Sequence, residues 1–303
     1  MAWEFEMVAG PFNPRLTEGP AWDGRYLFFT HIPKSLILRY DPQTGECRPF
    51  REHTNHTNGL AYDSEGRLYG CCSGGRSFVR FEPNGTTTTI VDRLDGAPLN
   101  TPNDLAIDRQ GRIWFSNAWN VGNIAPSEKE IPGRNCILRA DPQPDGTWVC
   151  KRMTHDTTGS NGLLISPDQR KLYMIQTSPE LRELRAYDIV DDGSLGKHIV
   201  LHQFGTDYRG PHRGIDGMCL DSEGNIVGAA GSHASGPGPM IYIWDPNGRV
   251  LETHPMPVGV DGPTNCTFGD PDLRSLYVTT AGGHLLRVRN TGRRGWLMWP
   301  PAR

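Results

Sequence analysis

The sequence has no long apolar run. No stretch of its 303 residues approaches the roughly 20 consecutive apolar residues that a membrane-spanning helix needs. The first twelve residues carry Glu4 and Glu6, where a secretory signal would be basic and then apolar. We therefore expect no membrane partner, and we expect the protein to be cytoplasmic.

Clusters of basic residues and paired cysteines are also missing. The net charge is −3 at pH 7, and the longest Lys/Arg run is Arg293–Arg294, so no basic stripe is present to neutralise a nucleic-acid backbone. The seven cysteines are odd in number and include no CxxC pair. Neither a zinc knuckle nor a complete disulfide framework is predicted, and we expect free thiols.

Glycine and proline, by contrast, are frequent. The chain contains 36 Gly and 25 Pro, which indicates many turns. No segment keeps a helical spacing of apolar residues over three turns. The composition therefore favours many short strands.

One pattern recurs six times along the chain. Each copy has a polar residue, a small or polar residue, an apolar strand, a turn with Gly or Asp, and a second apolar strand. The first residues of the copies are Glu18, Asn58, Asn103, Asn161, Asp216 and Asn265. Successive copies start 40 to 58 residues apart, a spacing typical of four-stranded propeller blades with loop insertions. We predict an all-β fold, one six-bladed β-propeller over residues 1–303, with blades starting near these six residues.

The last copy lacks a clear fourth strand of its own. Residues Trp3 to Val8 alternate between apolar and charged side chains, as an outer strand does. We predict that this segment completes the last blade, which would close the ring and remove its exposed sheet edges.

The first strand of each blade lines the central channel, so the six opening residues form a ring at one rim. All six are carboxylates or carboxamides, and two of them can carry negative charge. Such hard oxygen ligands suit one divalent metal ion on the axis. Calcium is the simplest ion for this set, while Zn, Mn, Mg or Fe(II) can use it with added waters. The alternative is that Asn and Asp open strands because they stabilise tight turns, which explains single positions but not the glutamate.

Two other features lie at the same rim. The insertion from Ala118 to Asn135 is either a lid or a solvated loop. His212 and Arg213 precede Asp216 by three or four residues, where they either contact an acidic or carbonyl substrate or have a plain surface role.

Several motifs resemble the SMP-30/gluconolactonase family. These are Glu18-Gly-Pro-Ala-Trp, Leu99-Asn-Thr-Pro-Asn-Asp, Ser160-Asn-Gly-Leu, Ile215-Asp-Gly-Met-Cys-Leu-Asp and Leu276-Tyr-Val-Thr-Thr-Ala. The resemblance implies a six-bladed propeller with a single divalent metal that hydrolyses sugar lactones. It also implies that Glu18, Asn161 and Asp216 bind the metal, and that Asn103 contacts substrate or metal-bound water.

The chain departs from that family pattern at two places. Thr101 stands where animal members have an arginine, two residues before the position of Asn103. Ser116-Asn117 stands where many bacterial lactonases have Thr-Asp, which changes the charge of the pocket wall. We retain Thr101, Asn117, Asn103 and Arg213 as candidate substrate-binding residues.

These residues predict a metal-dependent hydrolase that opens a small lactone or related ester. A bound metal acts as a Lewis acid and lowers the pKa of water. Asp216 is the candidate catalytic base, with a metal-bound hydroxide as the alternative, because coordination to the metal weakens a carboxylate as a base. Asn103 is the candidate donor to the developing oxyanion. Two alternatives stay open: a phosphotriesterase or arylesterase on the same scaffold, and a non-catalytic metal-binding protein. The sequence leaves the native substrate and the oligomeric state undetermined.

Overall fold

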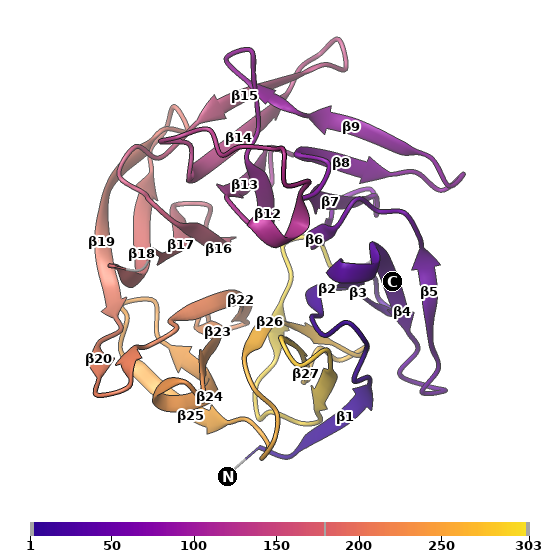
Figure 1. Ribbon diagram of the computed structural model, residues 1–303, viewed down its shortest axis with the longest axis vertical. Coiled ribbons are helices and arrows are strands. Elements are labelled where there is room, and N and C mark those ends of the chain that lie inside the picture. The colour runs from indigo at the N-terminus through magenta and orange to yellow at the C-terminus, as the bar shows by residue number, and fades with distance from the viewer. Residues whose placement is uncertain (1–2, 179, 301–303) are drawn as a thin grey trace.

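Six antiparallel sheets surround a common axis (Figure 1). They are seen in a computed structural model that describes residues 3–178 and 180–300. In each sheet four strands follow one another outward from the axis, and the short β29 (Gly295–Trp296) adds a fifth strand beside the inner strand of one sheet. The protein is therefore an all-β six-bladed propeller, as predicted.

The strands of the first three blades follow one another along the chain. Blade 1 contains β2 (Glu18–Trp22), β3 (Leu27–His31), β4 (Leu36–Tyr40) and β5 (Cys47–Arg51). Blade 2 contains β6 (Thr57–Tyr62), β7 (Leu68–Cys72), β8 (Ser77–Phe81) and β9 (Thr87–Val91). Blade 3 contains β12 (Thr101–Ile107), β13 (Ile113–Ala118), β14 (Cys136–Pro142) and β15 (Trp148–Arg152).

The last three blades use both ends of the chain. Blade 4 contains β16 (Ser160–Ile165), β17 (Lys171–Thr177), β18 (Arg182–Ile189) and β19 (Leu195–Gln203). Blade 5 contains β22 (Ile215–Asp221), β23 (Ile226–Ser232), β24 (Ser235–Trp244) and β25 (Val250–Pro255), with the short β29 (Gly295–Trp296) added beside β22. Blade 6 contains β26 (Pro263–Gly269), β27 (Ser275–Thr280), β28 (Leu285–Val288) and β1 (Phe5–Ala9).

Short elements complete the chain between these blades. Two hairpins of two-residue strands pair β10 (Arg93–Leu94) with β11 (Ala97–Pro98), and β20 (Thr206–Asp207) with β21 (Gly210–Pro211). Helical structure in residues 3–178 and 180–300 is limited to the 3-10 turns η1 (Ile32–Lys34) and η2 (Val121–Asn123). No helix in this part of the chain has the length and apolar character to cross a membrane.

The ring closes through the N-terminal strand, as the sequence predicted. β1 pairs antiparallel with β28, so the first residues of the chain supply the outer strand of the last blade. The inner strands of the six blades begin within two residues of the predicted openings. The repeat in the sequence therefore marked the inner strands correctly.

The turn that follows the inner strand uses the same device in several blades. Asp63, Asp108 and Asp221 each accept backbone N–H groups from the residues two and four positions later. The glycine of these turns has a positive φ, as Gly66 does at 73°, which few other residues adopt easily. The recurring Asp and Gly of the sequence thus fix where each inner strand ends.

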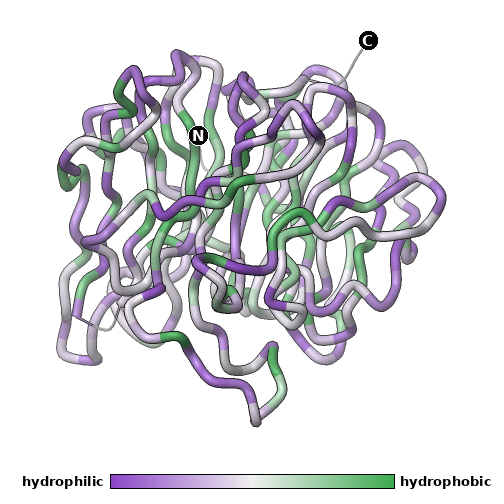
Figure 2. The backbone as a smooth tube through the Cα atoms, turned by 90° about the horizontal axis from the view of Figure 1, so that it is seen from above, coloured by the Kyte–Doolittle hydropathy of each residue, from purple (hydrophilic) through white to green (hydrophobic). Residues whose placement is uncertain are grey.

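The hydrophobic core is divided among the six junctions between blades. Each buried cluster draws its side chains from two neighbouring blades, and the six clusters together cover every junction of the ring. Figure 2 shows hydrophobic segments along the strands and hydrophilic ones mainly in the loops at the two faces. Since every blade is packed on both sides, opening any one junction exposes apolar surface.

The C-terminal segment closes one end of the central channel. Trp296, Leu297, Met298 and Trp299 line an axial cavity of about 160 Å³ together with residues of the inner strands. The indole N–H of Trp299 donates to the carbonyl of Ile107, at 3.1 Å. The opposite end of the channel, where the inner strands begin, carries the predicted ring.

Closure through β1 predicts that the first strand is essential to stability. Deleting residues 1–9 should lower the free energy of unfolding by about 3–5 kcal/mol, because it exposes the edge of β28 and uncovers apolar side chains of blade 6. Urea unfolding followed by tryptophan fluorescence measures the change. Met7→Thr is the control, since Met7 lies on the same strand but is 49% exposed. Equal stability of the deletion variant and the full chain would contradict this account.

Candidate active site

The inner strands are irregular at the residues that form the ring. In all six blades the pairing register between the first and second strands shifts near the opening residue. The residue after the opening one is glycine in four blades, namely Gly19, Gly59, Gly162 and Gly217. A Cβ on any of the four would overlap the neighbouring blade, and one on Gly217 would meet the amide of Asn265. These glycines allow the ring to be narrow.

Asp216 lies at the centre of a polar network that joins blades 4, 5 and 6. Its Oδ1 accepts a hydrogen bond of 2.7 Å from Nδ2 of Asn161. Its Oδ2 accepts one from Nη2 of Arg213, and Nη1 of Arg213 donates to the carbonyl of Pro263 at 2.9 Å. Two of the predicted site residues, Asn161 and Arg213, therefore both contact a third, Asp216.

Glu18, which is buried, and Asp104, which is half-buried, add two more carboxylates near Asp216. Glu18 is 5% exposed, and burial, followed by the negative charges of Asp216 and Asp104, raises its pKa well above the usual value. Burial raises the pKa of Asp104 to about 7, with Asp216 adding to the shift and hydrogen bonds from Leu105 and Asn265 opposing it. The axis thus holds more negative charge than its immediate surroundings neutralise.

This excess charge fits a divalent cation. Glu18, Asp216 and Asn161 offer two carboxylates and an amide, which are hard ligands. Within residues 3–178 and 180–300 no group of three or more His, Cys, Asp and Glu side chains is arranged to hold a metal. A metal site here therefore needs amide or carbonyl oxygens, and a cation would compete with Arg213 for Asp216.

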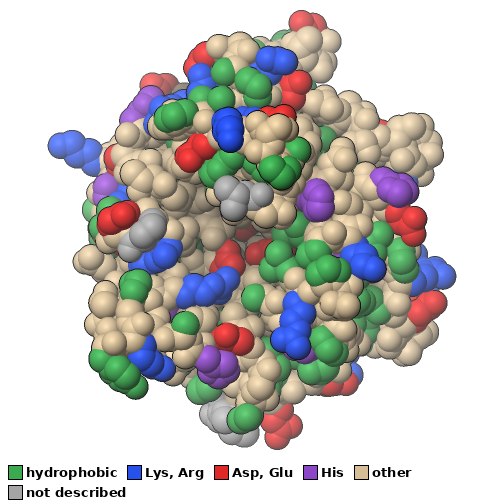
Figure 3. Space-filling model, in the orientation of Figure 1, with side chains coloured by type: hydrophobic (Ala, Val, Ile, Leu, Met, Phe, Trp, Pro, Cys, Tyr) green, Lys and Arg blue, Asp and Glu red, His purple; other side chains and the backbone are tan. Residues whose placement is uncertain are grey.

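A polar hollow of about 290 Å³ lies beside the ring. Asn103 and Asn161 line it from the ring, and Thr177 and Ser178 line it from the end of β17. The insertion between β13 and β14 contributes Trp119, Asn120, Glu130 and Asn135, and the segment that leads into β16 contributes Thr158, Gly159 and Ser160. Figure 3 shows the hollow at the centre of this face, with acidic side chains at its floor and Lys or Arg side chains beside them. The insertion, which we call the lid, therefore forms one wall of the hollow.

Thr101 and Asn117 hold the lid and do not line the hollow. Both are fully buried. Oγ1 of Thr101 accepts the N–H of Asn120 at 2.8 Å, and Nδ2 of Asn117 donates to the carbonyl of Arg134 at 2.9 Å. The two candidates from the family pattern therefore contact the two ends of the insertion.

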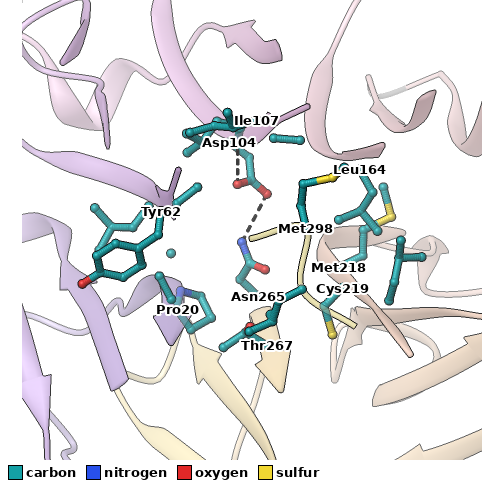
Figure 4. Close-up of a pocket in the computed structure, with 18 of the residues that line it drawn as sticks. Pro20, Tyr62, Asp104, Ile107, Leu164, Met218, Cys219, Asn265, Thr267 and Met298 are labelled. Carbon is teal, nitrogen blue, oxygen red and sulfur yellow. Dashed lines mark hydrogen bonds between the residues drawn. The ribbon is translucent and has the colours of Figure 1, made fainter. Parts of the chain in front are cut away.

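The sequence reasoning missed Asp104 as a residue of the axis. Figure 4 shows Asp104 and Asn265 pointing toward each other across the axial cavity, where Nδ2 of Asn265 lies 3.3 Å from Oδ2 of Asp104. A signal was present, because Asp104 takes the place that glycine has in four of the other blades. At this place in blade 3, the side chain of Asp104 enters the axial cavity.

Comparison with known proteins agrees with this geometry. A family model described as SMP-30/Gluconolactonase/LRE-like region matches residues 16–282. The chain belongs to this family. The match spans all six inner strands and therefore the whole ring of polar residues.

Sugar lactonases are among the similar members of the SMP-30/gluconolactonase/LRE-like family. A gluconolactonase of Zymomonas mobilis is 27% identical over 295 residues, which covers 90% of this chain and 78% of that protein. A pentonolactonase of Haloferax volcanii is 29% identical over 281 residues, covering 89% and 82%. A solved gluconolactonase from Xanthomonas campestris superposes with a TM-score of 0.78 at 27% identity, covering 94% of this chain and 89% of that chain.

The narrow ring can be tested at Gly217. Gly217→Ala should lower the free energy of unfolding by about 1–3 kcal/mol, because the added methyl displaces the Asn265 amide. Chemical denaturation measures this loss. Gly205→Ala is the matched control, since a Cβ on Gly205 has no neighbour within 4 Å. Similar stabilities of the two variants would show that the ring is wider than described.

The raised pKa of Asp104 predicts a pH dependence in metal-free protein. Its pKa is about 7 in the folded state, compared with 3.8 for an ordinary aspartate, so the folded state binds the proton more tightly. The protonated Asp104 carboxyl makes its full contribution to the free energy of unfolding below pH 4, and this contribution is lost as the pH rises to 7. In the wild type, the free energy of unfolding should therefore fall by a few kcal/mol between pH 4 and pH 7, and in Asp104→Asn this fall should be absent. Urea unfolding in the presence of a chelator measures the difference. Identical pH profiles for the variant and the wild type would contradict the shift.

Proposed function

We propose that this protein is a metal-dependent hydrolase that opens a small lactone, either a sugar lactone or a related cyclic ester. The observation that carries the proposal is the meeting of Asn161 and Asp216, with Glu18 nearby, beside a covered polar hollow. Membership of a family that contains gluconolactonase and pentonolactonase supports the substrate class.

In this proposal, Glu18, Asn161 and Asp216 hold one divalent cation. The bound cation would polarise the carbonyl of the lactone and lower the pKa of a water molecule. Calcium suits the oxygen ligands best, and Zn, Mn, Mg and Fe(II) are the alternatives. The buried carboxylates supply the negative charge that such an ion requires.

The protein side chains have distinct tasks around the reacting ester. Asp216 accepts the proton of the attacking water, and Asn103 donates to the oxyanion that develops on the carbonyl. Arg213 donates a hydrogen bond to the carboxylate of Asp216, and Asn161 donates to its other oxygen, so the two residues hold Asp216 in place.

The lid excludes water from the hollow and sets its shape. Asn100 is fully buried, and its Oδ1 accepts the N–H of Ile131 at 2.9 Å. Arg76 pairs with Glu128 at 2.6 Å and lies 5.5 Å from the ring of Trp119. With Thr101 and Asn117, these contacts fix the insertion over Asn103. Thr101 and Asn117 therefore assist substrate binding by holding the lid.

Substitution of Asp216 tests the catalytic role. Asp216→Asn should reduce kcat/KM for lactones by about 10²-fold or more, because it removes both the base and one charge of the metal site. Proton release with a panel of lactones, measured with and without chelator, gives the rates. The melting temperature should stay within a few degrees of the wild type. Asp191→Asn is the control, since Asp191 is exposed.

Other results of the same assay would redirect the proposal. A fully active Asp216→Asn variant would overturn the assignment of the base. Turnover of organophosphates or aryl esters, without lactones, would favour a phosphotriesterase or arylesterase. Metal binding without any turnover would leave a non-catalytic metal-binding protein.

A further inference from the structure

Two arginines lie together on the wall of the site, between blades 4 and 5. Arg213 precedes β22 and bonds to Asp216 and to the carbonyl of Pro263. Arg182 begins β18, and its side chain packs against Gly214, where an added Cβ would lie 3.5 to 3.9 Å from the Arg182 stem. The two guanidinium groups are thus held on the same side of the ring.

Arg182 contacts a residue that lines the polar hollow. Its Nη1 donates to the carbonyl of Thr177, and Thr177 lines the hollow together with Ser178 and Asn161. Its Nε is buried and has no hydrogen-bond partner among the described residues. The guanidinium is therefore held next to the wall of the hollow, and its hydrogen-bonding capacity is incompletely satisfied.

The charge of Arg182 has no close counter-ion. In the described part of the chain, no carboxylate lies within ion-pair distance of its nitrogens, although every other buried or half-buried arginine of the site region, Arg76 and Arg213, has one. Burial and then the positive charge of Arg213 lower the pKa of Arg182, and Glu180 opposes the shift only in part. Of these two neighbouring guanidinium groups, only that of Arg213 is therefore paired with a carboxylate.

Binding of a cation would leave Arg213 without its carboxylate as well. A cation held by Glu18, Asn161 and Asp216 competes with Arg213 for the carboxylate of Asp216. Both guanidinium groups can then bind an anion that comes from outside the protein. One anionic group on the substrate supplies this missing partner.

We infer that the substrate carries an anionic substituent, a carboxylate, phosphate or sulfonate, which Arg182 and Arg213 bind. This inference rests on the proposed lactonase function and names its substrate class. Guanidinium groups bind such anions through paired, charge-assisted hydrogen bonds. Glu130 lies on the lid side of the hollow, so the anionic end points toward blades 4 and 5 and the lactone ring lies nearer Asn103.

Matched lactones test the inference. The rates of a neutral sugar lactone are compared with those of the same lactone bearing a carboxylate, a phosphate or a sulfonate at the far carbon. The wild type should have a kcat/KM at least 10-fold higher for one of the anionic forms. Arg182→Met should lower the ratio of anionic to neutral kcat/KM by about 10- to 100-fold. Arg182→Lys should keep part of that preference, and its melting temperature shows that the fold is intact.

Arg109→Met is the control, since Arg109 is exposed in the turn that follows β12, at the other end of the inner strand. Its ratio should equal that of the wild type. Equal rates of wild type on neutral and anionic lactones, or an equal loss of both rates in Arg182→Met, would overturn the inference.

A binding measurement separates this inference from the proposed function. If no lactone is hydrolysed, the proposed function fails, and calorimetric titration with a sugar dicarboxylate and with the corresponding neutral sugar alcohol still decides the anion site. Binding of the dicarboxylate alone, weakened at least 10-fold by Arg182→Met, supports the site. Absence of dicarboxylate binding in the wild type overturns it.

Discussion

The central constraint in this protein is the narrow axis on which six inner strands meet. Glycine follows the opening residue in four blades, because a larger side chain there would overlap the neighbouring blade. The close approach brings carboxylates and amides from distant parts of the chain into contact, as Asn161 and Asp216 show. Packing at the blade junctions supplies the stability that offsets the repulsion between the buried carboxylates.

The two ends of the channel have different tasks. At one end, polar opening residues and the anchored insertion form a covered hollow with an excess of buried negative charge. At the other end, the segment from Trp296 to Trp299 lines the axial cavity and bonds to an inner strand. The polar hollow therefore lies at one end of the channel, while the segment at the other end contributes to the closure of the fold.

Much of this arrangement could be predicted from the sequence, because each blade repeats one local pattern. The opening residues, the closing strand and the position of the lid follow from that repeat. Asp104 was missed, because the direction of its side chain depends on the register shift between Pro102 and Leu105. Thr101 and Asn117 were chosen as candidates because they stand at positions of the family pattern. Their contacts with the lid become visible only in the folded structure. The tail follows the last repeat, so no periodicity indicated its place.

The central claim is that Glu18, Asn161 and Asp216 surround a cation. A crystal structure of the protein grown with calcium or manganese, with anomalous scattering recorded for manganese, tests it most directly. The account predicts one ion on the axis, bound by oxygens of these three side chains and displaced in an Asp216→Asn crystal. An ion bound only elsewhere, or three side chains turned away from each other around ordinary water, would contradict it.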